Sequence, residues 1–251
     1  MKDKNSSWKH VGKWYNTLVT KKGHYYHQTI ILPALLNWLS LKKGDGILDL
    51  ACGQGVLARH LPDGVTYYGL DAALPLIKEA KKYSKNPHHH FLLQDIEKPF
   101  RIEQKQFDSA AMILAFQNIR NPRKALKNAS IYLKKGGKLV LALNHPCFRI
   151  PRQSFWGVDE KKGVQYRRID RYMSPMEIPI EMHPSQKNGA TTVSFHLSLT
   201  AISKCIFEAG YVITKLEEWC SNKKSEGGKA KMENRARDEF PLFLGIECEK
   251  I

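Results

Sequence analysis

Three aspartates stand at the ends of three successive apolar segments in the first half of the chain. Asp49 lies within the first segment, Asp71 follows the second, and Asp95 comes after the third, behind Gln94. Short apolar segments that alternate with helical patterns are typical of parallel strands. Open parallel sheets bind their ligands outside the carboxyl ends of the strands. The spacing therefore predicts a crevice at this edge in which three carboxylates meet a ligand.

A turn of small residues joins the first of these segments to the pattern that follows it. Residues 46–55 are Gly-Ile-Leu-Asp-Leu-Ala-Cys-Gly-Gln-Gly, and a helical pattern begins at Val56. A strand that ends in such a turn before a helix brings backbone against a nucleotide. Asp71 follows Gly53 at about the spacing of an acid that binds both hydroxyls of a ribose, and Asp95 is placed to accept from an amine such as that of adenine. We therefore predict a ligand with an adenosine half.

The same turn also fits a dinucleotide enzyme. Residues 53–58 match Gly-x-Gly-x-x-Gly/Ala, and Asp71 lies at the expected distance. Asp49 argues against this interpretation, because a dinucleotide fold usually has an apolar residue inside its first strand. The chain also closes with a helix, a strand, a long loop and a strand instead of a second βαβ half. An NAD enzyme is the alternative that these residues leave open.

Five segments, taken in order, resemble the motifs of class I S-adenosylmethionine-dependent methyltransferases. They are Asp-Leu-Ala-Cys-Gly-Gln-Gly at 49–55, Tyr-Gly-Leu-Asp at 68–71, Gln-Asp-Ile at 94–96, Phe-Asp at 107–108 and Leu-Lys-Lys-Gly-Gly-Lys-Leu at 133–139. Motifs in this order are specific for the superfamily and not for a substrate. Ala51 stands where the family often has glycine, and we expect only a slightly altered turn there.

This resemblance implies S-adenosyl-L-methionine as the cofactor. The glycines of the turn would let backbone approach the methionine part, and Asp71 would bind the ribose hydroxyls. Asp95 would accept from the adenine amine, Ile96 would offer its backbone N–H to the ring, and Ala115 would line the methionine end. The complete predicted cofactor set is Tyr26, Asp49, Gly53, Gln54, Gly55, Asp71, Ala72, Asp95, Ile96 and Ala115.

Strands that alternate with helical stretches predict an α/β fold with a parallel sheet. The resemblance implies a Rossmann-like, seven-stranded sheet, mostly parallel with the last strand antiparallel, and a substrate cap inserted after strand five. We expect one domain with four parts. They are an N-terminal helical lid (1–45), the cofactor-binding core (46–143), the inserted cap (144–192) and the completion of the core sheet (193–251).

The predicted cap shows no clean periodicity and is rich in proline, arginine and aromatic residues. Irregular segments of this length inside a compact domain are usually functional, and the aromatic content argues against disorder. Stacking and charge pairing in such a segment suit a small acceptor that is aromatic or anionic. The predicted substrate-binding residues are Phe148, Trp156, Tyr166 and Arg168.

His145, directly after the fifth strand, is the predicted catalytic residue. It would act as a general base where the acceptor must lose a proton, and the alternative is a histidine that only shapes its turn. Cys147 lacks the polar neighbours of the cysteine nucleophiles found in some RNA methyltransferases, and we expect it to be inert. The three consecutive histidines at 88–90 alternate between the two faces of an extended segment, so we predict no metal site.

The chain has 40 lysines and arginines against 24 acidic residues, a net charge of +16. Such a bias attracts phosphates, acidic surfaces or anionic small molecules. We predict transfer of a methyl group to a small molecule. A tRNA or rRNA methyltransferase is favoured by charge alone, since no Asn/Asp-Pro-Pro-Tyr follows the fourth strand. A cofactor-binding protein without catalysis is the third interpretation.

Nothing in the sequence indicates a membrane partner. No apolar run is long enough to span a bilayer, and the polar first residues lack the apolar core of a secretory signal. The five cysteines are scattered without metal or redox spacing, which argues against a disulfide framework. We therefore expect a cytoplasmic protein, and no pattern predicts its oligomeric state.

Overall fold

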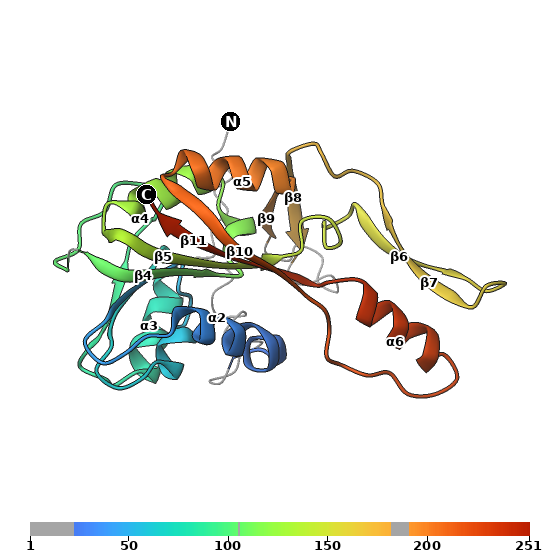
Figure 1. The fold of residues 1–251 in the computed structure, drawn as a ribbon, viewed down its shortest axis with the longest axis horizontal. Helices are drawn as coiled ribbons and strands as arrows, with labels where there is room; N and C mark the ends of the chain where they lie inside the picture. Colours follow the sequence, from blue (N-terminus) through green and yellow to red (C-terminus); the bar gives the residue numbers. More distant parts are fainter. Residues whose placement is uncertain (1–22, 105, 182–190) are drawn as a thin grey trace.

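The centre of the molecule is a seven-stranded sheet (Figure 1). The computed structural model describes residues 23–104, 106–181 and 191–251. The sheet has the strand order β10-β11-β5-β4-β1-β2-β3. Its members are β1 (Gly46–Leu50), β2 (Thr66–Asp71), β3 (His89–Leu93), β4 (Phe107–Ile113), β5 (Leu133–Asn144), β10 (Tyr211–Trp219) and β11 (Phe243–Lys250).

The direction of the strands agrees with the predicted architecture. Strands β1 to β5 pair in parallel, while β11 runs antiparallel to both β5 and β10. Strand β1 is buried along its whole length, as expected for a central strand with helices on both faces. The predicted seven-stranded sheet with an antiparallel last strand is therefore confirmed.

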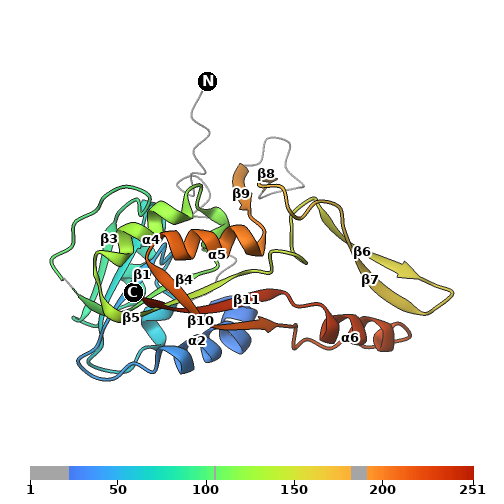
Figure 2. The same cartoon turned by 45° about the horizontal axis from the view of Figure 1, so that its top comes forward.

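Helices cover both faces of this sheet (Figures 1 and 2). On one face, α4 and α5 pack over a core that includes Leu126 and Ile206. On the other face, α2 and α3 pack over a core that includes Trp38 and Ile77. The longer helices are α2 (Leu32–Leu39), α3 (Leu74–Tyr83), α4 (Pro122–Ser130), α5 (Leu199–Glu208) and α6 (Ala230–Glu239).

The helical pattern after the glycine turn produces less structure than the sequence predicts. Only a single 3-10 turn forms there, η2 (Leu57–His60). Leu61 then adopts an extended conformation, with ψ of 150°. The reason is Pro62, because a proline disfavours the helical conformation of the residue before it. The glycine turn therefore has no long helix behind it.

The segment after β5 forms two hairpins, although its sequence predicts irregular structure. The first joins β6 (Ser154–Asp159) to β7 (Val164–Ile169), and the second joins β8 (Met176–Glu181) to β9 (Thr191–His196). The β6–β7 hairpin and α6 lie side by side and project from the core (Figures 1 and 2). Residues 182–190 of the predicted cap lie outside the described residues. The pairing of β9 with β8 carries this extra sheet to His196, beyond the predicted boundary at 192.

The described part of the predicted N-terminal lid begins with a π-helical turn, η1 (His27–Ile31), which continues directly into α2. π-Helical turns are rare in proteins, and those that occur are often found at functional sites. Residues 1–22 of the lid lie outside the described residues. Another short turn, η3 (Phe116–Asn118), follows β4. Within the part of the chain that the structure describes, no helix is long and apolar enough to cross a membrane.

Candidate cofactor and acceptor site

The turn after β1 contains three residues with positive φ. Ala51 has φ of 56°, Gly53 of 56° and Gly55 of 71°. A Cβ atom at Gly55 would lie 2.6 Å from the ring of Phe91, so packing requires glycine there. A Cβ atom at Gly53 would meet nothing within 4 Å. The backbone of Gly53 therefore faces open space that a ligand can occupy.

Asp71, at the end of β2, is hydrogen-bonded to the same turn. Its Oδ2 accepts from the backbone N–H of Gly53 at 2.9 Å, and its Oδ1 accepts from that of Ala73 at 2.8 Å. Burial raises the pKa of this carboxyl, and the two N–H donors lower it. Each carboxylate oxygen accepts more than one hydrogen bond, so Asp71 retains capacity for two hydroxyl groups. Ala72, between these contacts, is exposed.

Asp49 lies beneath the turn, inside β1. Its side chain is buried, and Oδ2 accepts a hydrogen bond of 2.7 Å from the hydroxyl of Tyr67 on β2. Burial raises the pKa of Asp49 to about 7, an effect that the Tyr67 hydrogen bond opposes and the charge of Asp71 increases. An acid in such surroundings changes its charge near neutral pH and binds a cation well once it is ionised.

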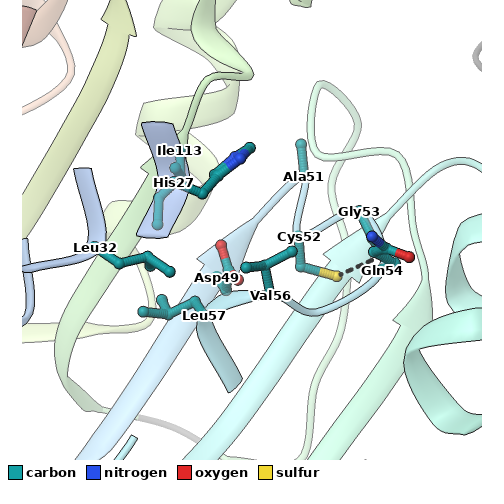
Figure 3. A pocket seen from close by; sticks show the side chains of 10 residues that line it. All are labelled: His27, Leu32, Asp49, Ala51, Cys52, Gly53, Gln54, Val56, Leu57 and Ile113. Carbon is teal, nitrogen blue, oxygen red and sulfur yellow. Dashed lines mark hydrogen bonds between the residues drawn. The ribbon is translucent and has the colours of Figure 1, made fainter. Parts of the chain in front are cut away.

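A pocket of about 410 Å³, counting the space at its open mouth, lies against Asp49 and the turn (Figure 3). His27 of η1 forms part of its wall and is 7% exposed. Burial, together with the nearby His24 and His60, lowers the pKa of His27 to about 4, so its ring is neutral. Its Nδ1 has no hydrogen-bond partner among the described residues. The lining residues are His27, Leu32, Asp49, Ala51, Cys52, Gly53, Gln54, Val56, Leu57 and Ile113.

The remaining predicted cofactor residues lie on neighbouring strand ends. Asp95 follows β3, its side chain is 42% exposed, and its Oδ1 accepts from the backbone N–H of Glu97 at 3.1 Å. Ile96 is buried. Ala115 follows β4 directly after Leu114, which has φ of 52°. Strained backbone of this kind is concentrated at functional sites.

Tyr26 stands one residue before His27 but faces a different part of the molecule. Its ring meets that of Phe243 edge to face, with the centroids 5.4 Å apart. Its hydroxyl lies 2.9 Å from the hydroxyl of Ser221. Among the described residues that line the pocket, His27 takes the place that the sequence assigns to Tyr26. The π-helical turn places His27 at the pocket.

Both ring nitrogens of His145 have partners. Nδ1 accepts from the backbone N–H groups of Cys147 and Phe148, both at 3.2 Å, and Nε2 lies 2.7 Å from Oε1 of Glu218. Burial lowers the pKa of His145, whereas Glu218 raises it. The ring is 5% exposed. This geometry favours the turn-shaping alternative, and the role of His145 as a base stays a prediction.

The structure brings together two of the four predicted substrate residues. Phe148 and Trp156 both contact Phe240, at centroid distances of 5.5 and 5.4 Å. We call Phe148, Trp156 and Phe240 the cap aromatic cluster. On the β6–β7 hairpin, Trp156 is opposite Arg167 and Gly157 is opposite Tyr166.

Tyr166 and Arg168 are not part of the cap aromatic cluster. Successive side chains of a strand point to opposite faces, so these two residues lie on the face of the hairpin opposite to Trp156 and Arg167. Arg168 instead forms an ion pair with Asp170, with Nε and Oδ1 2.5 Å apart. The sequence contained one sign of this arrangement, because in any strand the side chains of residues 166 and 168 point away from that of residue 167. The residue that joins the cluster is Arg167, which sequence reasoning missed.

Residues 48–141 match a family model described as a methyltransferase domain. The match starts in β1 and ends in β5, so it covers the strands that carry Asp49, Asp71 and the turn. This part of the chain is a methyltransferase domain of the class I, S-adenosylmethionine-dependent type. The predicted family and its cofactor are thereby confirmed for this domain.

Individual relatives agree with this assignment. A demethylmenaquinone methyltransferase from Paenarthrobacter aurescens is 32% identical over 120 residues, which are 47% of this chain and 46% of that protein. A ubiquinone biosynthesis O-methyltransferase from Coxiella burnetii is 28% identical over 139 residues, 54% of this chain and 58% of that protein. The match thus spans about half the length of these relatives.

A solved structure is similar over most of the chain. The S-adenosylmethionine-dependent methyltransferase from Mesorhizobium loti superposes with a TM-score of 0.67 over 86% of this chain and 96% of that one, at 23% identity. At this identity the similarity supports the fold and not a shared substrate. The substrate must therefore be inferred from the residues that surround the pocket.

Proposed function

We propose that this protein transfers the methyl group of S-adenosylmethionine to a small aromatic molecule. The observation that carries the proposal is the pocket in which Asp49, His27 and the open backbone of Gly53 meet. Asp71 lies beside it at the end of β2, with its carboxylate fixed by two backbone N–H groups. These residues suit the hydroxyl groups and the positive charge of this cofactor.

The residues in and beside the pocket bind different parts of the cofactor. Asp71 binds the ribose hydroxyls, Asp95 accepts from the adenine amine, and Asp49 and His27 surround the methionine end. When bound, S-adenosylmethionine supplies a methyl group on a sulfonium, and its transfer to an acceptor atom is an in-line displacement. The protein accelerates such a step chiefly by holding acceptor and methyl group in line at contact distance.

The class of methyl acceptor is inferred from the cap aromatic cluster. Phe148 and Trp156 gather with Phe240 beyond the carboxyl end of β5, and Trp156 is 43% exposed. Aromatic clusters of this kind favour flat, apolar ligands. One of the two relatives is named a demethylmenaquinone methyltransferase, and the other is named for ubiquinone biosynthesis. Both facts support an aromatic acceptor.

The test is to supply methyl-labelled S-adenosylmethionine together with a metabolite extract, with and without RNase. We expect label in the small-molecule fraction, at a level that RNase does not change. The Asp71→Ala variant should lose most of this incorporation at limiting cofactor, because it leaves hydrogen-bonding groups of the cofactor without a partner.

Two results would replace the proposal. Label that enters only RNA and disappears with RNase would assign the chain to the tRNA or rRNA methyltransferases, the alternative that the net charge of +16 favours. Tight binding of S-adenosylhomocysteine in calorimetry, without label in any fraction, would indicate a cofactor-binding protein without catalysis. All five cysteines are free, which supports the further proposal of a reducing, cytoplasmic location.

A further inference from the structure

Arg149 and Arg167 stand next to the cap aromatic cluster, and we call them the arginine pair. Arg149 follows the turn at the end of β5 and lies over the ring of Phe243, with its Cζ 5.0 Å from the ring centroid. Arg167 on β7 lies over the ring of Trp156 at 4.9 Å. Flat guanidinium groups that stack on aromatic rings hold their N–H donors in the plane of the group, where donors that the protein does not use can meet an anion.

Hydrogen bonds hold these guanidinium groups in place without neutralising them. Arg167 donates from Nε to the carbonyl of Phe148 and from Nη2 to the hydroxyl of Ser154, both at 2.8 Å. Arg149 donates from Nη1 to the carbonyl of Leu242 at 3.5 Å. All of these acceptors are uncharged. A bound anion would therefore supply the negative charge that balances the arginine pair, which these acceptors do not.

No ion pair within residues 23–104, 106–181 and 191–251 includes Arg149, Arg167 or the neighbouring Lys223. No carboxylate of these ranges therefore pairs with the arginine pair. Burial lowers the pKa of Arg149, and the charge of Arg167 lowers it further. The sequence outside these ranges contains one acidic residue, Asp3. Two like charges kept together in partial burial are costly unless an anion joins them.

A continuous series of contacts joins the arginine pair to the cofactor pocket. Phe243, beneath Arg149, also meets the ring of Tyr26, and the next residue, His27, lines the pocket. Lys223 lies 5.4 Å from the centroid of the Tyr26 ring and adds positive charge on this side. The arginine pair and the cofactor pocket are thus connected through Phe243 and Tyr26.

We propose that the arginine pair binds the carboxylate of an aromatic acid, whose ring packs against the cap aromatic cluster, so that the methyl acceptor is an aromatic carboxylate. This inference rests on the proposed methyltransferase function and narrows its substrate class. Arginine binds a carboxylate through two parallel N–H donors, which also fixes the orientation of the attached ring.

The test compares matched ligands on the full chain saturated with S-adenosylhomocysteine. The probes are 4-hydroxybenzoate, 3,4-dihydroxybenzoate and salicylate, each against its own primary amide, with binding measured by calorimetry and by the fluorescence of the cap tryptophan. We expect the preferred acid to bind at least about tenfold more tightly than its amide, because the amide lacks the charge. Arg149→Met and Arg167→Met should each abolish this preference.

Two further arginines of the insertion serve as comparisons. Arg171→Met removes the same charge at an exposed position and should preserve the preference. Arg168→Met should preserve it too, because Arg168 lies on the other face of the hairpin. Circular dichroism and S-adenosylhomocysteine affinity, both unchanged, would show that each variant is folded.

Several results would overturn the inference. They are equal binding of acid and amide, no binding of any acid at millimolar concentration, or an equal loss in Arg168→Met. Weaker tRNA binding by Arg149→Met, with no acid bound, would overturn it in favour of RNA. Failure of the proposed function is distinguishable, because S-adenosylhomocysteine would then not bind, or no label would reach any acceptor. Label transfer to a neutral small molecule, independent of the arginine pair, would sink only the aromatic-acid inference.

Discussion

Replacement of Asp49 by asparagine should make the stability of the cofactor-free protein less dependent on pH. Asp49 is 2% exposed and its pKa is raised from 3.8 to about 7, chiefly by burial. Between these two values the folded protein keeps a proton on Asp49 that the unfolded chain releases. The stabilisation is complete below pH 3.8 and is lost as the pH rises through about 7. Asparagine stays neutral throughout and still accepts from the hydroxyl of Tyr67.

The magnitude follows from the shift. Each pKa unit corresponds to about 1.4 kcal/mol. About two pH units of this range, from pH 5 to about pH 7, lie between pH 5 and pH 8. Raising the pH from 5 to 8 should therefore lower the unfolding free energy of the wild type by about 3 kcal/mol more than that of the variant. His27 acts in the opposite sense, because its pKa is lowered to about 4 and its stabilisation is lost as the pH falls. This contribution is present in both proteins and cancels in the difference.

The assay is urea unfolding of both cofactor-free proteins at pH 5 and pH 8, with the difference in unfolding free energy compared between the two conditions. Tyr67→Phe provides a second check. The Tyr67 hydrogen bond lowers the pKa of Asp49, so its removal should move the pH dependence to higher pH without abolishing it. A difference between Asp49→Asn and wild type that is the same at both pH values would refute the reasoning.

Three further predictions concern the turn, the ribose contact and the histidine. Ala51→Gly should stabilise the protein by about 1 kcal/mol in urea unfolding, because Ala51 adopts the left-handed conformation with φ of 56°; a loss of stability would show that this strain is absent. Asp71→Ala should weaken S-adenosylhomocysteine binding by about 1–3 kcal/mol in calorimetry, and unchanged affinity would remove the ribose assignment. His145→Gln should lower the melting temperature and leave kcat at saturating acceptor within about tenfold of wild type, since Nδ1 holds the turn and Nε2 is paired with Glu218 of β10. A far larger fall in kcat with an unchanged melting temperature would restore His145 as the base.

The sequence contains enough to predict the sheet, because each strand leaves a local pattern. Strand β1 is an apolar run with one acid, β2 ends at a second acid, and β3 ends two residues before a third. The antiparallel direction of β11 came from the family resemblance, since no local pattern distinguishes the two directions. The helix expected after the glycine turn failed because one downstream residue, Pro62, outweighs the apolar spacing before it.

The sequence signal for the residues around the pocket is stronger than that for the cap residues, for a physical reason. Asp71 and Gly53 meet each other at strand ends, and strand ends are visible in the sequence. The arginine pair depends on which face of a hairpin each residue occupies, and a shift of one residue exchanges the faces. Arg167 and Arg168 are adjacent and chemically identical in the sequence, yet only Arg167 stacks on Trp156.

The π-helical turn at the start of the described chain connects the two halves of the site. Tyr26 and His27 are consecutive, but Tyr26 packs on Phe243 beneath Arg149, whereas His27 forms a wall of the cofactor pocket. A movement of His27 on cofactor binding must be transmitted to Tyr26 through a single peptide unit. Cofactor and acceptor affinities should therefore be linked, and linkage requires that each ligand change the affinity of the other by the same factor.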